Sequence, residues 1–142
     1  MPPKPRLVAA FLFGSGLTAL IYQTVWQRMF RLAFGSSTAA SAAVLGIFLG
    51  GLGLGGWWFG TRAERHERPL SFYGDLEAGV ALSAALTPFL LDLLSHGYFA
   101  LGGSASLGTA GATIVRLLIA VLVMGPSVVL MGGTLPAAAR AK

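Results

Sequence analysis

Three acidic side chains and one arginine lie within or beside long apolar stretches of this sequence. Asp75 and Glu77 open one stretch, Asp92 lies near its far end, and Arg116 lies near the start of the next. Charges are costly in apolar surroundings, so each needs a partner or a function. Glu77 is a candidate proton or cation site. The simpler interpretation is that Asp75 and Glu77 form a charged cluster with the preceding arginines.

Asp92 and Arg116 are expected to form a structural ion pair. If their two stretches are antiparallel helices, both side chains lie at the same end, whereas Glu77 lies at the opposite end. Arg28 is an alternative partner for Asp92. His96 follows Asp92 by four residues and is a candidate proton relay, although a solvated surface histidine is the simpler interpretation.

No catalytic or metal-binding constellation is visible in the sequence. The chain contains no cysteine, which excludes disulfides and thiolate sites. Residues 51–56 match G-x-G-x-x-G, but no strand precedes them and they lie inside an apolar stretch, so dinucleotide binding is rejected. We therefore predict no cofactor and expect this chain by itself to have no enzymatic activity. Whether it belongs to a longer enzyme stays open.

The composition indicates an all-α integral membrane protein. Of its 142 residues, 55% are hydrophobic and 11% are charged, and the mean hydropathy is +0.74. The segment from Ser36 to Gly60 lacks charged residues. As a helix it would be roughly 37 Å long, enough to cross a hydrocarbon core of about 30 Å. The net charge is +5, but the basic residues form no continuous stripe, so no nucleic-acid partner is predicted.

The whole chain, residues 1–142, is predicted to be a single transmembrane module of about four helices. Their expected ranges are 7–26, 36–60, 72–94 and 112–135. Ser71 is the expected N-cap of the third helix. The Gly/Ser/Ala-rich residues 97–111 are expected to form a short loop outside the membrane. Pro88 and Pro126 are expected to kink the third and fourth helices.

The first helix is interpreted as a membrane span that is retained. Tyr22 and Trp26 near its end suit the aromatic belt of a membrane interface. A cleaved signal peptide is the alternative, because Ala40-Ser41-Ala42 resembles a cleavage site. Gln23 and Arg28 lie between that site and the apolar run, which argues against cleavage.

The second helix is rich in glycines that are expected to form its packing surface. These glycines are Gly46, Gly50, Gly53, Gly55 and Gly60. Small residues at such spacing let a neighbouring helix approach closely within a bilayer. We therefore expect this helix at the centre of the bundle, and we expect Gly50→Leu or Gly53→Leu to disrupt packing.

The basic residues predict that both termini face the cytoplasm. With four spans, seven of them share one side and two lie on the other. The seven are Lys4, Arg6, Arg62, Arg65, Arg68, Arg140 and Lys142, and the two are Arg28 and Arg31. Basic residues are retained on the cytoplasmic side, so the predicted topology is N-in and C-in.

Two runs of residues resemble a known family. They are Ile21-Tyr22-Gln23-Thr24-Val25-Trp26-Gln27-Arg28 and Leu130-Met131-Gly132-Gly133-Thr134-Leu135-Pro136. Both resemble the N-terminal membrane region of bacterial membrane-bound spermidine-synthase-like proteins, in which a major-facilitator-like membrane region is fused to an aminopropyltransferase domain. The positions that the resemblance marks are Tyr22, Gln23, Trp26, Arg28, Met131, Gly132, Thr134 and Pro136.

The resemblance implies a multi-pass protein of the bacterial inner membrane that anchors or serves a soluble aminopropyltransferase-like domain, which is not found in these 142 residues. One alternative is part of a major-facilitator-like transporter for a small cation or polyamine, with Glu77 or Asp92 contacting the amine. Another is a structural subunit of a membrane complex. The expected partners are the lipid bilayer, further membrane helices or the catalytic domain, and other membrane subunits.

Overall fold

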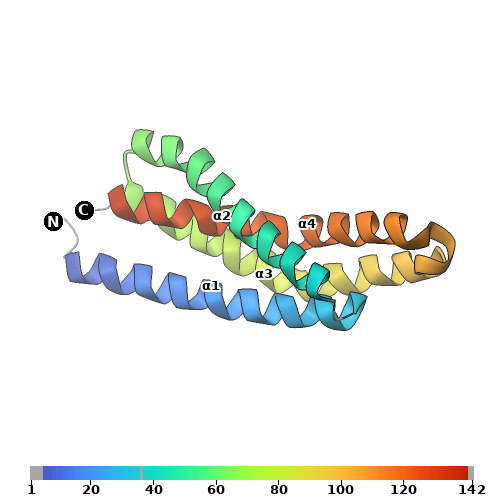
Figure 1. Cartoon of the computed structure of the whole chain (residues 1–142). Coiled ribbons are helices and arrows are strands. Elements are labelled where there is room, and N and C mark those ends of the chain that lie inside the picture. Colours follow the sequence, from blue (N-terminus) through green and yellow to red (C-terminus); the bar gives the residue numbers. More distant parts are fainter. Residues whose placement is uncertain (1–4, 36, 141–142) are drawn as a thin grey trace.

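The structure is a computed structural model that describes residues 5–35 and 37–140. These residues form four helices, namely α1 (Pro5–Phe34), α2 (Thr38–Arg65), α3 (Pro69–Ala100) and α4 (Gly103–Arg140). Each helix is long and apolar enough to cross a membrane. The prediction of an all-helical chain with four candidate spans is confirmed at that level. The start of α1 and the end of α4 lie at the same end of the bundle (Figure 1).

The helices are longer than predicted. Ser36, the expected first residue of the second helix, lies outside the described residues. The expected N-cap at Ser71 is wrong, because α3 already begins at Pro69 with Arg68 at the N-cap position. Proline suits the first turn of a helix, since the N–H group that it lacks would have no acceptor within the helix. Pro88 lies inside α3, which continues through it.

The predicted loop over residues 97–111 is mostly helical. The α3 helix continues to Ala100, and α4 begins at Gly103. Gly102 makes the turn with a φ of 92°, and Gly108 interrupts α4 with a φ of 67° and a ψ of 176°. Positive φ values cost glycine little because it has no Cβ atom. The prediction of a turn from composition is therefore correct only at these glycines. The α3–α4 hairpin extends beyond the α1–α2 turn (Figure 1).

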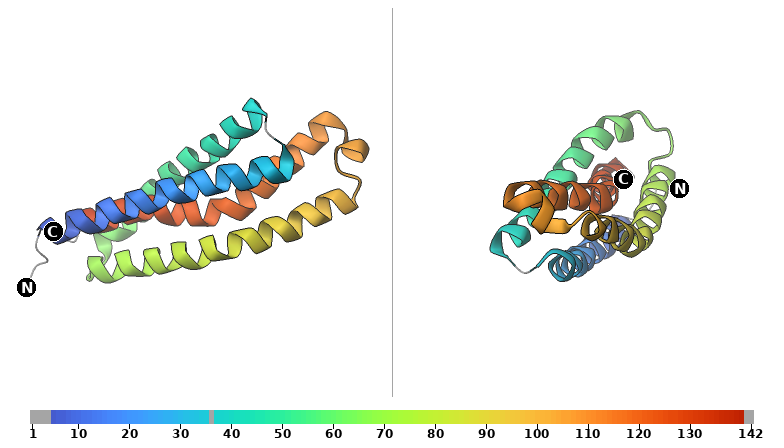
Figure 2. Two further views of the ribbon diagram at one scale, coloured as in Figure 1. Left: turned by 90° about the horizontal axis from the view of Figure 1, so that it is seen from below. Right: turned by 90° about the vertical axis from the view of Figure 1, so that its right-hand side faces the viewer.

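The central helix is α4, which corrects the prediction for the second helix. Within the most apolar window of each helix, 39% of residues are buried in α4 and 17% in α2. The α4 helix lies between α2 and α3 (Figure 2) and packs extensively against both. Val123, Met124 and Val128 of α4 are almost completely buried. By contrast, α1 is the least buried of the four helices.

The closest approach between helices joins α2 to α4. A Cβ atom added at Gly55 would overlap the backbone of Val129, and one at Gly132 would overlap the carbonyl of Leu52. Gly51 also contacts Val128. Small residues on both helices therefore allow direct contact between the two backbones, as in other tightly packed membrane helices.

Only one of the five predicted packing glycines makes this contact. An added Cβ atom would meet nothing within 4 Å at four positions, which are Gly46, Gly50, Gly53 and Gly60. The expectation that Gly50→Leu or Gly53→Leu disrupts the bundle finds no contact to support it among the described residues. The reason is geometric, because the face of α2 that lies against α4 contains Gly51 and Gly55.

Trp26 is a core residue, contrary to the expected interfacial position. Its side chain is 1% exposed, stacked on Tyr22 and edge-on to Phe48, with ring centroids 5.6 and 6.5 Å apart. It belongs to a cluster to which all four helices contribute. The large apolar ring of Trp26 fills the space between α1 and α2, so packing decides its position.

Candidate functional site

Ser15, Tyr73 and Glu77 form a carboxylate site between α1 and α3. The Ser15 hydroxyl donates a hydrogen bond of 2.6 Å to Glu77 Oε1. Tyr73 lies one helical turn before Glu77 on the same face of α3, and its hydroxyl donates to the Phe11 carbonyl over 3.3 Å. These bonds join two helices that otherwise make few contacts. The Ser15 hydroxyl is the hydrogen-bond donor to Glu77.

Glu77 lies near one end of the bundle. It follows the first residue of α3 by about 12 Å in a helix of roughly 48 Å. A hydrocarbon core of about 30 Å centred on this helix would leave roughly 9 Å beyond each face. Glu77 would then lie just inside the apolar core, within reach of interfacial water. The side chain is half-buried, so this site suits a carboxylate that exchanges a proton or contacts an amine.

Asp75 does not share this site. Its side chain is exposed, and it belongs to a set of exposed charged residues at the end of the bundle where α2 ends and α4 ends. We call this set the charged rim, and it consists of Arg62, Glu64, Arg65, Glu67, Arg68, Asp75 and Arg140. Arg140 donates a hydrogen bond of 3.3 Å to the Glu64 carbonyl, which connects the last turns of α2 and α4. Asp75 and Glu77 therefore do not form the predicted cluster, because Asp75 is exposed on the charged rim and Glu77 lies between α1 and α3.

Asp92 and Arg116 do not form the predicted ion pair. Asp92 contacts His96 Nδ1 at 3.4 Å through its carboxylate, and the two side chains are 74% and 78% exposed. Arg116 instead lies against two aromatic rings, with its guanidinium carbon 5.9 Å from the Phe34 centroid and 5.5 Å from the Tyr98 centroid. The face of an aromatic ring attracts a cation through its π electrons. The helices are antiparallel as assumed, but Asp92 points away from the core.

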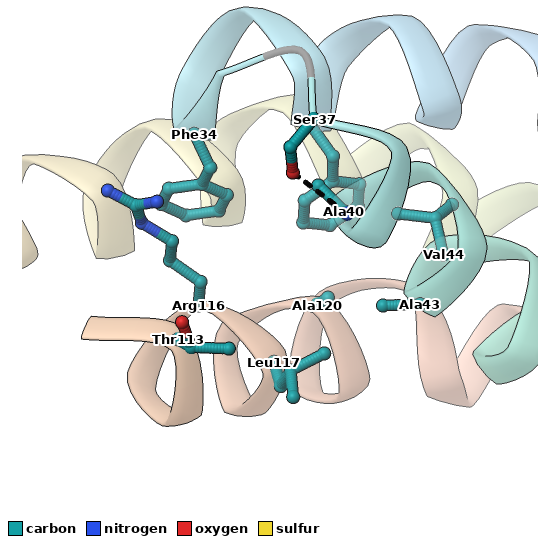
Figure 3. A pocket seen from close by; sticks show the side chains of 10 residues that line it. Phe34, Ser37, Ala40, Ala43, Val44, Thr113, Arg116, Leu117 and Ala120 are labelled. Carbon is teal, nitrogen blue, oxygen red and sulfur yellow. Dashed lines mark hydrogen bonds between the residues drawn. The ribbon is translucent and has the colours of Figure 1, made fainter. Parts of the chain in front are cut away.

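Arg116 lines a partly enclosed cavity of about 330 Å³, which we call the arginine pocket. The cavity lies between the α1–α2 turn and α4 (Figure 3). Its apolar walls are Phe30, Phe34, Ala40, Ala43, Val44, Leu117 and Ala120, and its polar lining is Ser37, Thr113 and Arg116. Arg116 Nε and the Tyr98 hydroxyl are buried, and neither has a hydrogen-bond partner among the described residues.

The remaining marked residues have structural surroundings. Gln23 is half-buried. Arg28 is exposed and lines a shallow surface groove on α1 together with Arg31. In the second family-like run, Met131 and Gly132 are buried, Pro136 is half-buried, and the Thr134 hydroxyl donates to the Met131 carbonyl over 2.7 Å. Because Gly132 contacts α2, this run has a packing role.

Comparison with known protein families, curated proteins and solved structures finds no match to this chain. Among the described residues, no three His, Asp or Glu side chains gather as ligands for a metal ion. The two polar sites are therefore interpreted from their own geometry.

Sequence reasoning did not identify several residues of these sites. Ser15 is a single hydroxyl in an apolar helix, and nothing in its spacing pointed to Glu77, which is 62 residues further along the chain. Ser37 and Thr113 were missed for the same reason. Phe34 and Tyr98 had a weak signal, since aromatic residues near helix ends often lie beside interfacial arginines.

Proposed function

We propose that this chain is the membrane module of a spermidine-synthase-like protein of the bacterial inner membrane, and that it serves a soluble aminopropyltransferase-like domain. The resemblance of residues 21–28 and 130–136 to this family supports the family part of the proposal. The four long apolar helices support a position in a bilayer. In this proposal both termini and the charged rim face the cytoplasm, where basic residues are retained.

The observation that carries the proposal is the charged rim. Its residues are exposed and lie in or beside the last turns of α2 and α4 and the first two turns of α3. The end of α4 lies at the same end of the bundle as the start of α1 (Figure 1). The described connections between helices, residues 66–68 and 101–102, are far too short to hold a cofactor-binding domain. A surface rich in both signs of charge favours an oriented, salt-sensitive contact with a soluble domain. The rim is therefore the proposed docking surface.

The rim is tested by reversing charges on it. In Arg65→Glu/Arg68→Glu, two exposed arginines become acidic, and the bundle should remain folded because neither side chain is buried. We expect binding of a purified aminopropyltransferase domain to membranes containing the chain to fall about tenfold at low salt. Binding to the unaltered chain should weaken as the salt concentration rises, because ions screen surface charges.

The matched control is Arg28→Glu/Arg31→Glu, which makes the same charge change on exposed arginines near the opposite end of α1. This variant should bind the domain as the unaltered chain does. Equal binding by both double variants, or binding that ignores salt, would contradict docking at the rim. Conversion of putrescine to spermidine by the purified chain, supplied with the aminopropyl donor, would contradict the module proposal itself.

A second candidate function is part of a major-facilitator-like transporter for a small cation or polyamine. The hydrogen-bonded position of Glu77 beside Ser15 and Tyr73 favours it, because a half-buried carboxylate with fixed orientation is suited to an amine. Under this alternative, Glu77→Gln abolishes uptake of labelled spermidine into cells that express the chain. Asp75→Asn is the control, since Asp75 is a nearby exposed carboxylate. Unchanged uptake in Glu77→Gln would exclude this role for Glu77.

The third candidate is a structural subunit of a membrane complex. Four glycines of α2 favour it, because a Cβ atom added at any of them would meet nothing within 4 Å among the described residues. These positions leave room for another helix to approach. A stable membrane partner that co-purifies with the chain, in the absence of domain binding and of polyamine uptake, would distinguish it from the other two candidates.

A further inference from the structure

We propose that the arginine pocket binds the phosphate headgroup of an anionic phospholipid, with the start of an acyl chain lying along its apolar wall. This proposal is independent of the docking and transport proposals, which concern the opposite end of the bundle. It depends on three observations. Arg116 has a buried N–H group without a hydrogen-bond partner among the described residues, the lining has both polar and apolar parts, and the cavity adjoins a helix turn.

The cation is Arg116. Its Nε atom is buried without a hydrogen-bond partner among the described residues, and Asp92, the acidic residue expected to neutralise it, contacts His96 instead. The rings of Phe34 and Tyr98 hold the guanidinium at a fixed place. Rings attract a cation but accept no strong hydrogen bond, so the Nε–H group of Arg116 still requires an acceptor. A phosphate oxygen is the acceptor that a guanidinium binds best.

The start of α2 lines the same cavity as Arg116 and adds further donors. The Ser37 side chain accepts a hydrogen bond of 3.0 Å from the Ala40 N–H group (Figure 3), which leaves its own hydroxyl proton free to donate. Ser37 is also the N-cap of α2, so the positive end of that helix dipole points toward the cavity. The first turn of any helix carries N–H groups that have no acceptor within the helix. Together these groups favour an anion.

The rest of the lining is apolar and favours a hydrocarbon chain. Leu117 and Ala120 of α4 line the cavity together with Ala43 and Val44 of α2. Ala120 lies on the side of α4 that is turned toward α2 (Figure 3). A cavity of about 330 Å³ is large enough for a phosphate with its glycerol and the first methylene groups of a chain. A free phosphate ion would leave most of this apolar surface uncovered. The lining therefore fits an amphiphile, and in a bilayer the abundant anionic amphiphile is a phospholipid.

The position of the cavity agrees with this occupant. The cavity adjoins the α1–α2 turn, where Phe34 ends α1 and Ser37 precedes α2. In a spanning bundle such a turn lies near the headgroup region, and arginines and aromatic residues are typical there. The lipid phosphate can thus reach Arg116 while its acyl chain remains at membrane depth.

The test measures lipid retention by the whole chain purified in neutral detergent. Native mass spectrometry counts bound phosphatidylglycerol and, in a separate sample, bound phosphatidylcholine with the same acyl chains. We expect the unaltered chain to prefer phosphatidylglycerol. In Arg116→Gln that preference should fall about tenfold, the usual effect of losing one hydrogen bond to a charged group. Arg28→Gln, an exposed arginine outside the pocket, should retain the preference.

A second pair of variants tests the apolar wall and leaves Arg116 intact. Ala43→Leu fills the cavity from α2, whereas Ala42→Leu adds the same volume at the neighbouring exposed position. Lipid retention should fall in the first variant and remain in the second. Equal retention by Arg116→Gln and the unaltered chain, or equal binding of the two lipids, would overturn the proposal. Displacement of phosphatidylglycerol by an equal concentration of inorganic phosphate would show a phosphate site without a lipid chain, and would also overturn it.

Discussion

At the scale of single residues, glycine position decides how closely two helices approach. Gly51 and Gly55 face α4, whereas a Cβ atom added at Gly50 or Gly53 of the same helix would meet nothing within 4 Å among the described residues. A shift of one residue along a helix turns the side chain by about 100°. Neighbouring glycines therefore lie on different faces, and only the structure distinguishes the contact glycines from the others.

Gly55→Ala tests the contact. The new Cβ atom would overlap the Val129 carbonyl and lie 2.8 Å from its carbon, and a backbone group has no rotamer by which to move away. We expect a loss of about 2 kcal/mol in the free energy of unfolding, the usual cost of overpacking. Thermal or denaturant unfolding of the chain in detergent measures it.

Gly50→Ala is the matched control, since its Cβ atom has nothing within 4 Å. It should be neutral or stabilising by up to about 1 kcal/mol, because alanine is the better helix former. Equal destabilisation by both variants would mean that the α2–α4 contact is not the one described.

At the scale of the helices, α4 organises the bundle. It packs against α2 through glycines and valines and against α3 through a hydroxyl contact, in which Ser127 donates to Ser83 Oγ over 2.8 Å. Ser127 is completely buried, and in an apolar interior a buried hydroxyl needs such a partner. Substitutions that change the inward face of α4 should therefore weaken both neighbouring interfaces together.

Val128→Ala and Val121→Ala make the same chemical change at a buried and at an exposed position of α4. Val128 is fully buried, whereas Val121 is 48% exposed. Within a bilayer the side chain is surrounded by apolar atoms in both the folded and the separated states, so the cost is mainly lost packing. We expect Val128→Ala to destabilise by about 1 kcal/mol and Val121→Ala to have little effect. The midpoint of unfolding in detergent reports the difference, and a larger effect at Val121 would contradict the central position of α4.

At the scale of the whole molecule, the ends of the bundle differ in the number of charged residues. The charged rim gathers where α2 and α4 end, and Arg28, Arg31 and Arg116 lie toward the other end. Lys4 and Lys142, which also entered the sequence-based topology, lie outside the described residues. The α3–α4 hairpin extends past the α1–α2 turn (Figure 2), so the two ends also differ in shape.

Reporter fusions test the orientation of the whole chain in the membrane. A fusion at Lys142 should give a cytoplasmic signal, and one at Gly103, the first residue of α4, should give a signal on the outer side. The physical reason is that basic segments resist translocation. An outer signal at Lys142 would contradict four spans with both termini inside.

The sequence alone was sufficient for the number of helices and for their apolar character. Long uncharged stretches and charged residues between them are local properties, and the length of a helix follows directly from its residue count. These features depend on composition along the chain and require no knowledge of neighbours.

Only the tertiary structure decided which helix is central, which glycines make contact, and that Arg116 faces Phe34 and Tyr98 while Asp92 faces outward. A soluble helix shows its buried face by an apolar stripe, but these helices are apolar on every face. Lipid is as apolar as a protein core, so the hydrophobic effect does not choose the inward face. Close packing and hydrogen bonds choose it, and both depend on side chains that are far apart in the sequence.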